Sequence, residues 1–229
     1  MTSIEARQFF ADLASQPDRE IDLARAAFVY ALDEYPDLDI EKYLARLEMM
    51  QYAVWERVEH KEEPTAVLHT LNAYLFDERG FAGNREDYHD PRNSYLNEVM
   101  DRRLGLPITL SVIYLDIAQR LLLAVVGVGM PGHFLVKYHE EDLELFIDPF
   151  DSGKLMTEGE CADRLNEVVG EEVEFSPQYL EPTGKKQTLS RMLANLRNAY
   201  LLREDFGRAL QVTDKMLLLN PLDAETVRD

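Results

Sequence analysis

The chain is poor in cysteine, in basic residues and in long apolar runs. Cys161 is its only cysteine, so no disulfide can form within the chain, and this usage is typical of a reducing compartment. The 24 Lys and Arg residues are outnumbered by 43 Asp and Glu residues, which gives a formal net charge of −19 at pH 7. Contacts to phosphate need clustered Lys and Arg, so this balance argues against nucleic-acid binding and against an anionic membrane surface.

The sequence also shows no pattern typical of a targeting or membrane-spanning segment. The N-terminus, MTSIEARQFF, has an early acidic residue and no apolar run of signal-peptide length. No stretch reaches the roughly 18 apolar residues that a membrane-spanning helix needs. We therefore expect a cytoplasmic location.

The composition that remains is that of a globular protein. The chain has 229 residues, of which 46% are hydrophobic, with 11 Gly and 10 Pro, and this suits one domain with a small appendage. Apolar residues at helical spacing predict helices that begin near Ser3 and cover residues 21–35, 40–58 and 64–80. We interpret residues 1–80 as packing helices, residues 81–182 as the core and residues 186–229 as an appended helix pair.

A dense polar segment leads into the core. Its members are Asn84, Tyr88, Asp90, Asn93 and Ser94. Asp90 followed by proline is a good N-cap and first turn, so a helix is predicted from residue 91 to residue 103. The cluster has two interpretations at this point: capping and turn chemistry, or the lining of a binding cleft.

The stretch from Gly105 to Phe150 reads as a buried helix followed by three strands. The helix is expected over residues 107–121, with apolar residues around most of its surface. The strands are expected at residues 125–128, 133–138 and 143–148. The last two are separated by four polar residues, which is a common hairpin length.

That four-residue loop sets the pairing of the hairpin. It places Val136 opposite Leu145 on an apolar face, and His133 opposite Asp148 on the other face. Side chains that face each other across a hairpin have Cβ atoms about 5 Å apart. The register therefore predicts a hydrogen bond between the His133 imidazole and the Asp148 carboxylate.

Shorter signals follow the hairpin. Thr157 with Glu160 resembles a capping box for a short helix through Leu165. A strand is expected at residues 173–175, before a proline-bounded linker at 177–182.

The C-terminal segment carries the tetratricopeptide pattern. Leu193, Leu196, Tyr200, Ala209 and Pro221 occupy its positions in order. A single repeat cannot bury its own apolar face, and about three are needed for independent stability. The helix pair must therefore dock on the main domain or belong to a longer natural chain with a second repeat after Asp229, and we expect the latter.

Three segments together resemble a known family. They are RGFAGNREDYHDPRNSYLNEVMDRRLGLPITLSVIYLDIA, GMPGHFLV and LFIDPF, and they look like the SirB-type transglutaminase-like family over about residues 38–229. The resemblance implies an α+β, mostly helical fold. It would have a transglutaminase-like (papain-like) core with a small antiparallel sheet, a helical N-terminal part and a C-terminal tetratricopeptide helix pair.

The resemblance also implies where a catalytic site would lie. In true transglutaminases and related cysteine proteases a cysteine stands at the start of the core helix, and a His and an Asp follow on strands. His133 and Asp148 match those two positions, whereas the cysteine position falls at about Pro107. Cys161 lies elsewhere and is expected to be a small buried hydrophobe, so the ordinary thiol mechanism is not expected.

Hydroxyl groups are the remaining candidate nucleophiles. Ser111 lies one turn beyond Pro107, Thr109 is close by, and Ser94 lies in the polar segment. Ser111 activated by His133, with Asp148 orienting the ring, would satisfy triad logic. The alternative is that Thr109 and Ser111 simply bond back to helix carbonyls.

Two functions from different classes therefore stand. The preferred one is a non-catalytic interaction or regulatory module, a pseudoenzyme that binds a protein or peptide through the tetratricopeptide region. A binding cleft formed by the polar segment with Pro107 and Thr109 also stays open, in which amides at the start of the core helix would meet an anionic group. The alternative is a hydrolase or acyltransferase that uses His133, Asp148 and a Ser or Thr nucleophile. We expect no cofactor and no metal, because His133, His89, Asp90 and Asp148 lack ligand spacing.

Overall fold

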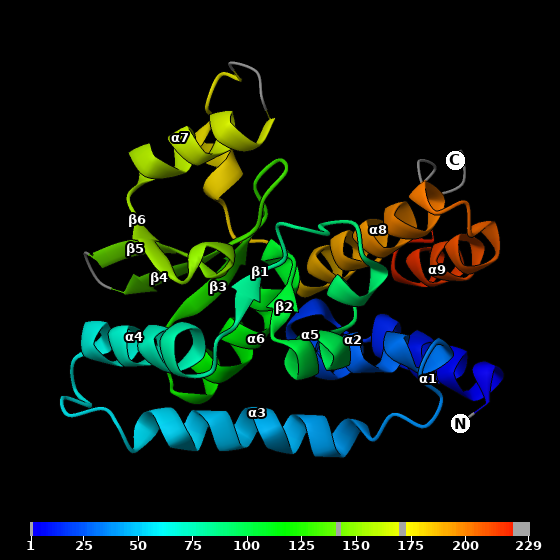
Figure 1. The fold of residues 1–229 in the computed structure, drawn as a ribbon, viewed down its shortest axis with the longest axis horizontal. Coiled ribbons are helices and arrows are strands. Elements are labelled where there is room, and N and C mark those ends of the chain that lie inside the picture. Colours follow the sequence, from blue (N-terminus) through cyan, green and yellow to red (C-terminus); the bar gives the residue numbers. More distant parts are fainter. Residues whose placement is uncertain (1, 141–142, 170–172, 222–229) are drawn as a thin grey trace.

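The computed structural model describes residues 2–140, 143–169 and 173–221. Its first part is helical: α1 (Ser3–Ser15), η1 (Asp18–Glu20), α2 (Leu23–Tyr30), η2 (Ala31–Asp33), α3 (Ile40–Trp55) and α4 (Pro64–Asn72). Thr2, Asp22 and Asp39 start three of these helices, since each side chain accepts a hydrogen bond from the backbone N–H three residues on. Figure 1 shows α3 along one edge of the molecule, with α4, α1 and α2 lying over it. The helical nature predicted for this part is confirmed.

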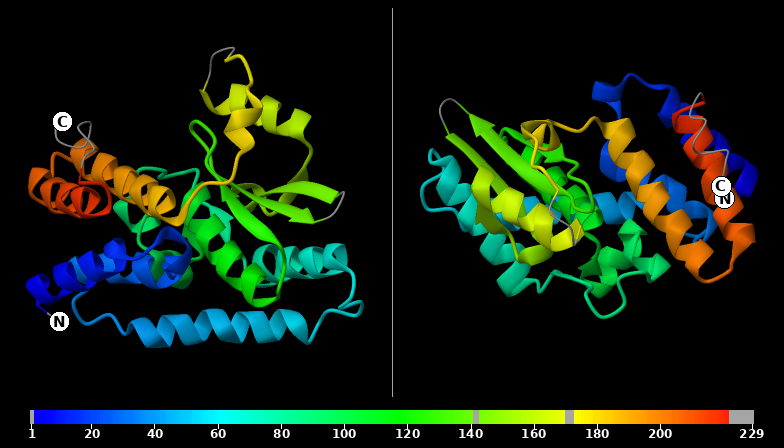
Figure 2. Two further views of the ribbon diagram at one scale, coloured as in Figure 1. Left: turned by 180° about the vertical axis from the view of Figure 1, so that it is seen from behind. Right: turned by 90° about the horizontal axis from the view of Figure 1, so that it is seen from above.

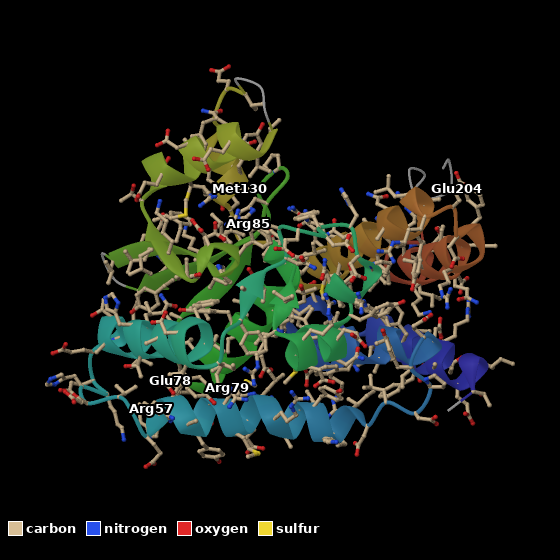
Figure 3. The ribbon with its side chains drawn as sticks, in the orientation of Figure 1. Arg57, Glu78, Arg79, Arg85, Met130 and Glu204 are labelled. Carbon is tan, nitrogen blue, oxygen red and sulfur yellow. The ribbon has the colours of Figure 1, made fainter. Side chains whose placement is uncertain are left out.

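The fourth helix does not continue regularly to Gly80 as predicted. It changes at Ala73 into the π-helical segment η3 (Ala73–Glu78). The Tyr74 ring there lies under the guanidinium groups of Arg57 and Arg79, at 5.1 and 6.0 Å from its centroid. Arg57 also pairs with Glu78 at 3.3 Å, and Figure 3 shows the two with Arg79 between α3 and α4. The spacing of apolar residues does not reveal this π-helical turn, which coincides with the contacts that Arg57 and Arg79 make to the Tyr74 ring.

The polar segment folds as short pieces. These are β1 (Ala82–Gly83), the 3₁₀ turn η4 (Pro91–Asn93), α5 (Leu96–Arg102) and β2 (Leu104–Gly105), with β1 and β2 paired in parallel. The single helix predicted from residue 91 to residue 103 is therefore wrong. The Ser94 carbonyl, at the break, accepts a hydrogen bond from the buried Tyr30 hydroxyl. A tertiary bond thus takes an acceptor that a continuous helix would have used.

The core helix α6 (Pro107–Arg120) is enclosed as expected. Every residue from Pro107 to Leu115 is buried. In Figure 1 it runs through the middle of the molecule, between the sheet and the N-terminal helices. Such enclosure explains why its apolar residues are not confined to one stripe.

The sheet has four strands where the sequence predicts three. They are β3 (Val125–Val128), β4 (Leu135–Glu140), β5 (Leu143–Asp148) and β6 (Lys154–Met156), antiparallel and in chain order. The extra strand, β6, follows the 3₁₀ turn η5 (Pro149–Asp151). A three-residue strand has too few positions to show alternation, so its sequence carries no signal.

The predicted register of the β4–β5 hairpin is wrong by two residues. Val136 pairs with Ile147 instead of Leu145, and the strands extend to Glu140 and from Leu143. The connection is thus shorter than the four residues assumed, and its residues 141 and 142 lie outside the described ranges. A shift of two residues leaves each side chain on its original face, so the apolar face is still buried.

Each face of the sheet has its own core. Val136 and Ile147 point into the main core around α6. Leu135 and Phe146 point the other way, into a smaller core that includes Leu165 of α7 (Glu158–Val169). Figure 1 shows α7 above the sheet, on the side away from α6. The helix predicted from the capping box therefore covers the second face and extends beyond Leu165.

No strand forms at Val173–Phe175, contrary to prediction. In the described residues this segment is irregular and leads to the 3₁₀ turn η6 (Pro177–Leu180). Val173 and Phe175 instead pack their side chains against the smaller core. Their apolar character reflects burial under α7 and not strand pairing.

The C-terminal helices α8 (Lys185–Leu202) and α9 (Phe206–Leu219) dock on the N-terminal part. Figure 2 shows α9 beside α1, and Figure 3 labels Glu204 at the turn that joins the pair. Polar bonds hold the contact: Lys215 reaches Asp33, the Tyr95 and Tyr200 hydroxyls lie 2.8 Å apart, and Arg7 lies 2.6 Å from Asp214. The helix pair therefore docks on the main body, and the expectation of a longer natural chain with a second repeat stays a prediction.

The architecture as a whole is α+β and mostly helical, as predicted. A small antiparallel sheet lies between α6 on one face and α7 on the other. Across the ranges described above, no helix is both long and apolar enough to cross a membrane.

Candidate functional site

His133 and Asp148 come together where strands β4 and β5 meet the core. His133 lies two residues before β4, after a bend in which Gly132 has a φ of +69°. Asp148 is the last residue of β5 and the N-cap of η5. His133 Nε2 lies 2.9 Å from Asp148 Oδ2, and the two side chains are 4% and 0% exposed. The expected hydrogen bond therefore forms despite the shifted register.

The Asp148 carboxylate determines which nitrogen of His133 carries the proton. Its Oδ1 accepts hydrogen bonds from the backbone N–H groups of Phe150 and Asp151, at 3.0 and 3.3 Å. Its Oδ2 faces His133 Nε2 and, at 3.4 Å, Arg164 Nε. In the neutral tautomer that donates from Nε2 to this carboxylate, Nδ1 carries a lone pair. Within the described residues Nδ1 has no hydrogen-bond partner.

Proline stands at the position where the family resemblance predicts a nucleophile. Pro107 is the first residue of α6 and supplies neither a thiol nor a backbone N–H. Cys161 is fully buried in α7, and burial raises the pKa of its thiol to about 12, with further opposition from the Asp148 charge. A thiol with such a high pKa is not a nucleophile near neutral pH.

The candidate hydroxyl groups are turned to other partners. Thr109 Oγ1 accepts from the Leu106 N–H at 2.9 Å and lies 2.9 Å from Asn93 O, to which it donates. Ser111 Oγ lies 3.5 Å from Phe134 O. Ser94 Oγ is buried with no partner among the described atoms. In the part of the chain that the structure covers, no Ser or Thr hydroxyl bonds to His133.

The polar segment is bonded mostly to itself. Asn84 Nδ2 donates to Asn93 Oδ1 at 3.0 Å, and Asn93 Nδ2 donates to Asp87 O at 2.7 Å. The buried Asp90 side chain caps η4 and pairs with Arg92 at 2.6 Å. These bonds show the capping and turn chemistry that was one of the two interpretations. They also tie the segment to α6, because Asn93 O is the acceptor of Thr109.

Tyr88 is the member of that segment that turns towards the His133 region. Its ring packs edge-on against Phe150, with centroids 6.0 Å apart, and Phe150 in turn lies 6.1 Å from the His133 ring. Tyr88 is 37% exposed. The Arg85 guanidinium lies 4.8 Å over the Phe150 ring. Tyr88, Phe150 and Arg85 thus form an aromatic and cationic rim beside His133.

A second arginine comes from the C-terminal helix pair. Arg191 of α8 donates from Nη2 to Met130 O at 2.8 Å and to His133 O at 2.9 Å. Burial lowers the pKa of its guanidinium, and it has no carboxylate partner among the described residues. Figure 3 shows Met130 and Arg85 at this junction between the sheet, α7 and α8. Arg191 therefore holds the loop that delivers His133.

Sequence reasoning missed Phe150, Arg85, Arg164 and Arg191 as neighbours of the pair. Phe150 offered a local signal, since it lies two residues after Asp148 and its ring fills the space over Gly83, where a Cβ would lie 2.4 Å from the ring. Arg164 and Arg191 gave none, because α7 and α8 approach the site only in the folded chain. Arg85 lies in the polar segment itself, but nothing in the sequence placed it over Phe150. Elsewhere in the described ranges, the one group spaced to share a metal ion is the exposed trio His60, Glu62 and Glu63, outside this site.

Comparisons with known proteins agree with the geometry. Residues 41–194 match the model of the transglutaminase-like superfamily. A UPF0162 protein of Xylella fastidiosa (strain 9a5c) is 37% identical over 220 residues, which is 95% of this chain and 78% of that protein. A UPF0162 protein of Vibrio cholerae is 28% identical over 171 residues, which is 74% of this chain and 63% of that protein.

A eukaryotic protein also matches part of the chain. Human F-box only protein 21 is 34% identical over 143 residues, which is 59% of this chain and 22% of that protein. No solved structure matches. The family model spans the core helix, the hairpin and the His133–Asp148 pair, so the chain belongs to the transglutaminase-like superfamily.

Proposed function

We propose that this protein is a non-catalytic member of the SirB-type branch, acting in protein interaction or regulation. The observation that carries the proposal is the start of α6, where Pro107 stands at the position expected for the nucleophile and the nearby hydroxyl groups of Thr109 and Ser111 bond to backbone atoms. The His133–Asp148 pair is then a retained structural element, with Asp148 capping η5 and pairing with Arg164.

We further propose that α8 and α9 are a tetratricopeptide repeat that binds a protein or peptide partner. The signature residues Leu193, Leu196, Tyr200 and Ala209 are buried, which supports this assignment. Leu202, Phe206 and Leu210 leave large apolar side chains 64%, 66% and 70% exposed on the same pair. Contiguous exposed apolar patches mark interaction sites, so we take these three side chains as the candidate contact surface.

The catalytic question is tested with purified protein and simple acyl substrates. We expect no turnover of p-nitrophenyl acetate or of a glutamine-containing peptide with hydroxylamine, beyond that of the His133→Ala variant. His139→Ala is the matched control, because His139 is an exposed histidine of β4, the strand that follows His133. Turnover that is lost in His133→Ala and kept in His139→Ala would contradict the proposal.

The binding role is tested with surface variants. Cross-linking followed by mass spectrometry identifies a partner, and its affinity is then measured for Phe206→Asp combined with Leu210→Asp. We expect binding to fall at least about tenfold, a loss of about 1.4 kcal/mol. Met49→Asp on α3 is the control, because Met49 is similarly exposed at 69%. An equal loss in both variants would argue against the helix pair as the binding surface.

A hydrolase or acyltransferase is the second candidate, and one observation favours it. His133 Nδ1 keeps a lone pair without a described partner, as a general base requires. Ser111 would have to leave Phe134 O and turn to that nitrogen. Labelling of Ser111 by a fluorophosphonate, abolished in His133→Ala, would support this candidate over the interaction role.

A further inference from the structure

A cavity of about 270 Å³ lies between the polar segment and the turn that joins α8 to α9. The turn contributes Arg203 and Asp205, which flank the Glu204 labelled in Figure 3. The other walls come from the end of η2, from η4 and from the facing sides of α8 and α9. Of the described residues that line the cavity, none belongs to the His133–Asp148 pair, so this is a separate site.

The carboxylates of the wall already accept hydrogen bonds from arginine. Asp90 accepts from the Arg92 side chain at 2.9 and 3.1 Å and from its backbone N–H at 3.0 Å. Glu34 accepts from Arg208 at 2.7 and 3.1 Å, and Asp205 accepts from the same guanidinium at 2.8 Å. An entering cation would have to compete with these arginines, so the acids do not favour a cationic ligand.

Arg203 is the arginine of the wall that these acids leave without a hydrogen bond. The carboxylates of Asp87 and Asp90 lie 3.6 and 3.9 Å from its Nη2, which is beyond hydrogen-bond distance. Its side chain is half exposed and makes no hydrogen bond to the described residues. Its N–H donors are therefore available to a ligand, and a guanidinium binds anionic oxygens best.

A second unused donor is buried in the same wall. The hydroxyl groups of Tyr95 and Tyr200 lie 2.8 Å apart, and the two residues are 5% and 6% exposed. Because one hydroxyl donates to the other, the proton of the accepting hydroxyl is left over, and it has no acceptor among the described residues. A buried donor without an acceptor costs free energy, and a ligand oxygen in the cavity would recover it.

Tyrosine rings form the apolar part of the wall. The rings of Tyr35 and Tyr95 meet edge-on with centroids 5.3 Å apart, and the Arg208 guanidinium lies 5.8 Å from the centroid of the Tyr200 ring. Such rings pack well against another aromatic group. The volume lies just below the range of about 300–1,000 Å³ that is typical of small-molecule sites, so the bound group must be small.

We propose that this cavity binds a small aromatic carboxylate, with the carboxylate between Arg203 and the spare tyrosine hydroxyl proton and the aromatic ring against Tyr35. The same chemistry is present in a free aromatic acid and in an aromatic residue at the C-terminus of a peptide. The site is independent of the interaction role proposed above, because it includes no residue of the exposed apolar group on α8 and α9.

Isothermal titration at pH 7.5 with benzoate, benzamide and benzamidine tests the proposal, because these are similar in shape and carry a negative, no and a positive charge. We expect saturable binding of benzoate with a Kd of about 1 mM, at least about tenfold tighter than benzamide, and no binding of benzamidine. N-acetyl-phenylalanine represents a peptide C-terminus: binding tighter than benzoate identifies a C-terminal residue as the occupant, and weaker binding identifies a free acid.

A variant at the arginine separates the local donor from the overall charge. Arg203→Gln is expected to weaken benzoate binding about tenfold, and the half-exposed position should tolerate the change. Arg19→Gln is the matched control, because it removes the same charge from a side chain that is 87% exposed and does not line the cavity. Benzoate affinity should stay unchanged in this control.

Variants of the tyrosine pair test the second donor. Tyr95→Phe alone leaves the Tyr200 proton free and should keep benzoate affinity within about twofold. Tyr95→Phe combined with Tyr200→Phe removes the donor and should weaken binding about tenfold, while the loss of both bonding partners leaves neither unpaired in the fold. Circular dichroism checks that the double variant is folded.

Four results would overturn the proposal. They are the absence of saturable benzoate binding, benzamide or benzamidine binding as tight as that of benzoate, equal losses in Arg203→Gln and Arg19→Gln, and a folded double tyrosine variant that binds benzoate as the natural protein does.

Discussion

The Asp148 carboxylate is the point where four donors converge. Two backbone N–H groups, the His133 ring and the Arg164 guanidinium each lie within 3.4 Å of one of its oxygens. Removing this carboxylate would leave the His133 ring and two backbone N–H groups without their acceptor, although Arg164 would keep Asp151 at 2.6 Å. Breaking such buried networks is costly, at about 3–5 kcal/mol. The pair is therefore stable enough to persist without any catalytic role. Among the described residues Nδ1 of His133 has no partner, and this favours the catalytic alternative.

Cys161 is expected to be unreactive in the folded protein. Its thiol has a pKa of about 12, whereas an ordinary thiol has a pKa of 9. At any pH below both values, the fraction of Cys161 present as thiolate is therefore roughly one thousandth of that of an ordinary thiol. Ellman's reagent at pH 8 should therefore react fully in 6 M guanidinium chloride and at least about a hundredfold more slowly in buffer. A native rate close to the denatured rate would show an accessible thiol and would reopen thiol chemistry.

Asp90 is expected to make stability depend on pH in the acid range. Burial opposes its ionisation, but hydrogen bonds from Arg92 outweigh burial and lower the pKa of the Asp90 carboxyl below its ordinary 3.8. Its contribution is therefore complete above about pH 4 and is lost as the pH falls through the lower folded-state value.

Urea unfolding of the natural protein and of Asp90→Asn at pH 6, 4 and 3 measures this contribution. The difference in unfolding free energy should be largest at pH 6 and should shrink at pH 3. Asp101→Asn, which removes a half-exposed partner of Arg46, should cost no more than about 1 kcal/mol at pH 6. A gap between natural protein and Asp90→Asn that widens towards pH 3 would contradict the assignment.

Among the elements, α8 links the C-terminal helix pair to the His133 loop. Arg191 donates to two carbonyls of that loop, and its guanidinium lies 5.5 Å from the Phe134 ring centroid. Thr183, just before the helix, accepts from the Gly129 N–H at 2.8 Å. The loop that positions His133 is therefore held from outside the sheet, by a segment more than 50 residues away in sequence.

Arg191→Leu should loosen this loop. The change keeps an apolar stem and leaves the Met130 and His133 carbonyls without their donor, so we expect a loss of about 1–3 kcal/mol in unfolding free energy. Urea denaturation measures the loss, and amide exchange at His133 should accelerate with it. Arg19→Leu, at a side chain that is 87% exposed, should stay within about 0.5 kcal/mol. Equal effects of the two substitutions would show that Arg191 does not support the loop.

For the whole molecule, the dominant feature is its charge. The net charge of −19 implies self-repulsion in the compact state, which dissolved salt screens over about 10 Å at 0.1 M. Exposed ion pairs such as Arg7–Asp214 and Arg25–Glu41 oppose this trend, but each is worth at most about 1 kcal/mol.

Salt should therefore stabilise the protein. Raising NaCl from 10 to 300 mM is expected to raise Tm by about 2–4 °C, which corresponds to about 1 kcal/mol for a domain of this size. Scanning calorimetry measures the shift, and an equal osmolality of sucrose serves as the uncharged control. A fall in Tm with salt would mean that the surface ion pairs outweigh the repulsion.

Local patterns determined most of the elements and half of the candidate site. The spacing of apolar residues predicts the N-terminal helices, the buried α6 and the β4–β5 pair. N-caps such as Asp22 and Asp39 add the helix starts, because each cap bonds within one turn of its own helix. The meeting of His133 and Asp148 also followed from local pattern. Its prediction survived a register error because a shift of two residues keeps both side chains on the same face.

Only the tertiary structure decided what surrounds that pair. The break at Ser94 depends on the Tyr30 hydroxyl, and the register depends on a connection two residues shorter than assumed. Arg164 and Arg191 reach Asp148 and the His133 loop from α7 and α8. The local sequence encodes the spacing of apolar residues, the helix caps and the face of a strand on which each side chain lies. Partners that approach from distant segments are selected by the packing of the whole chain, which no local window contains.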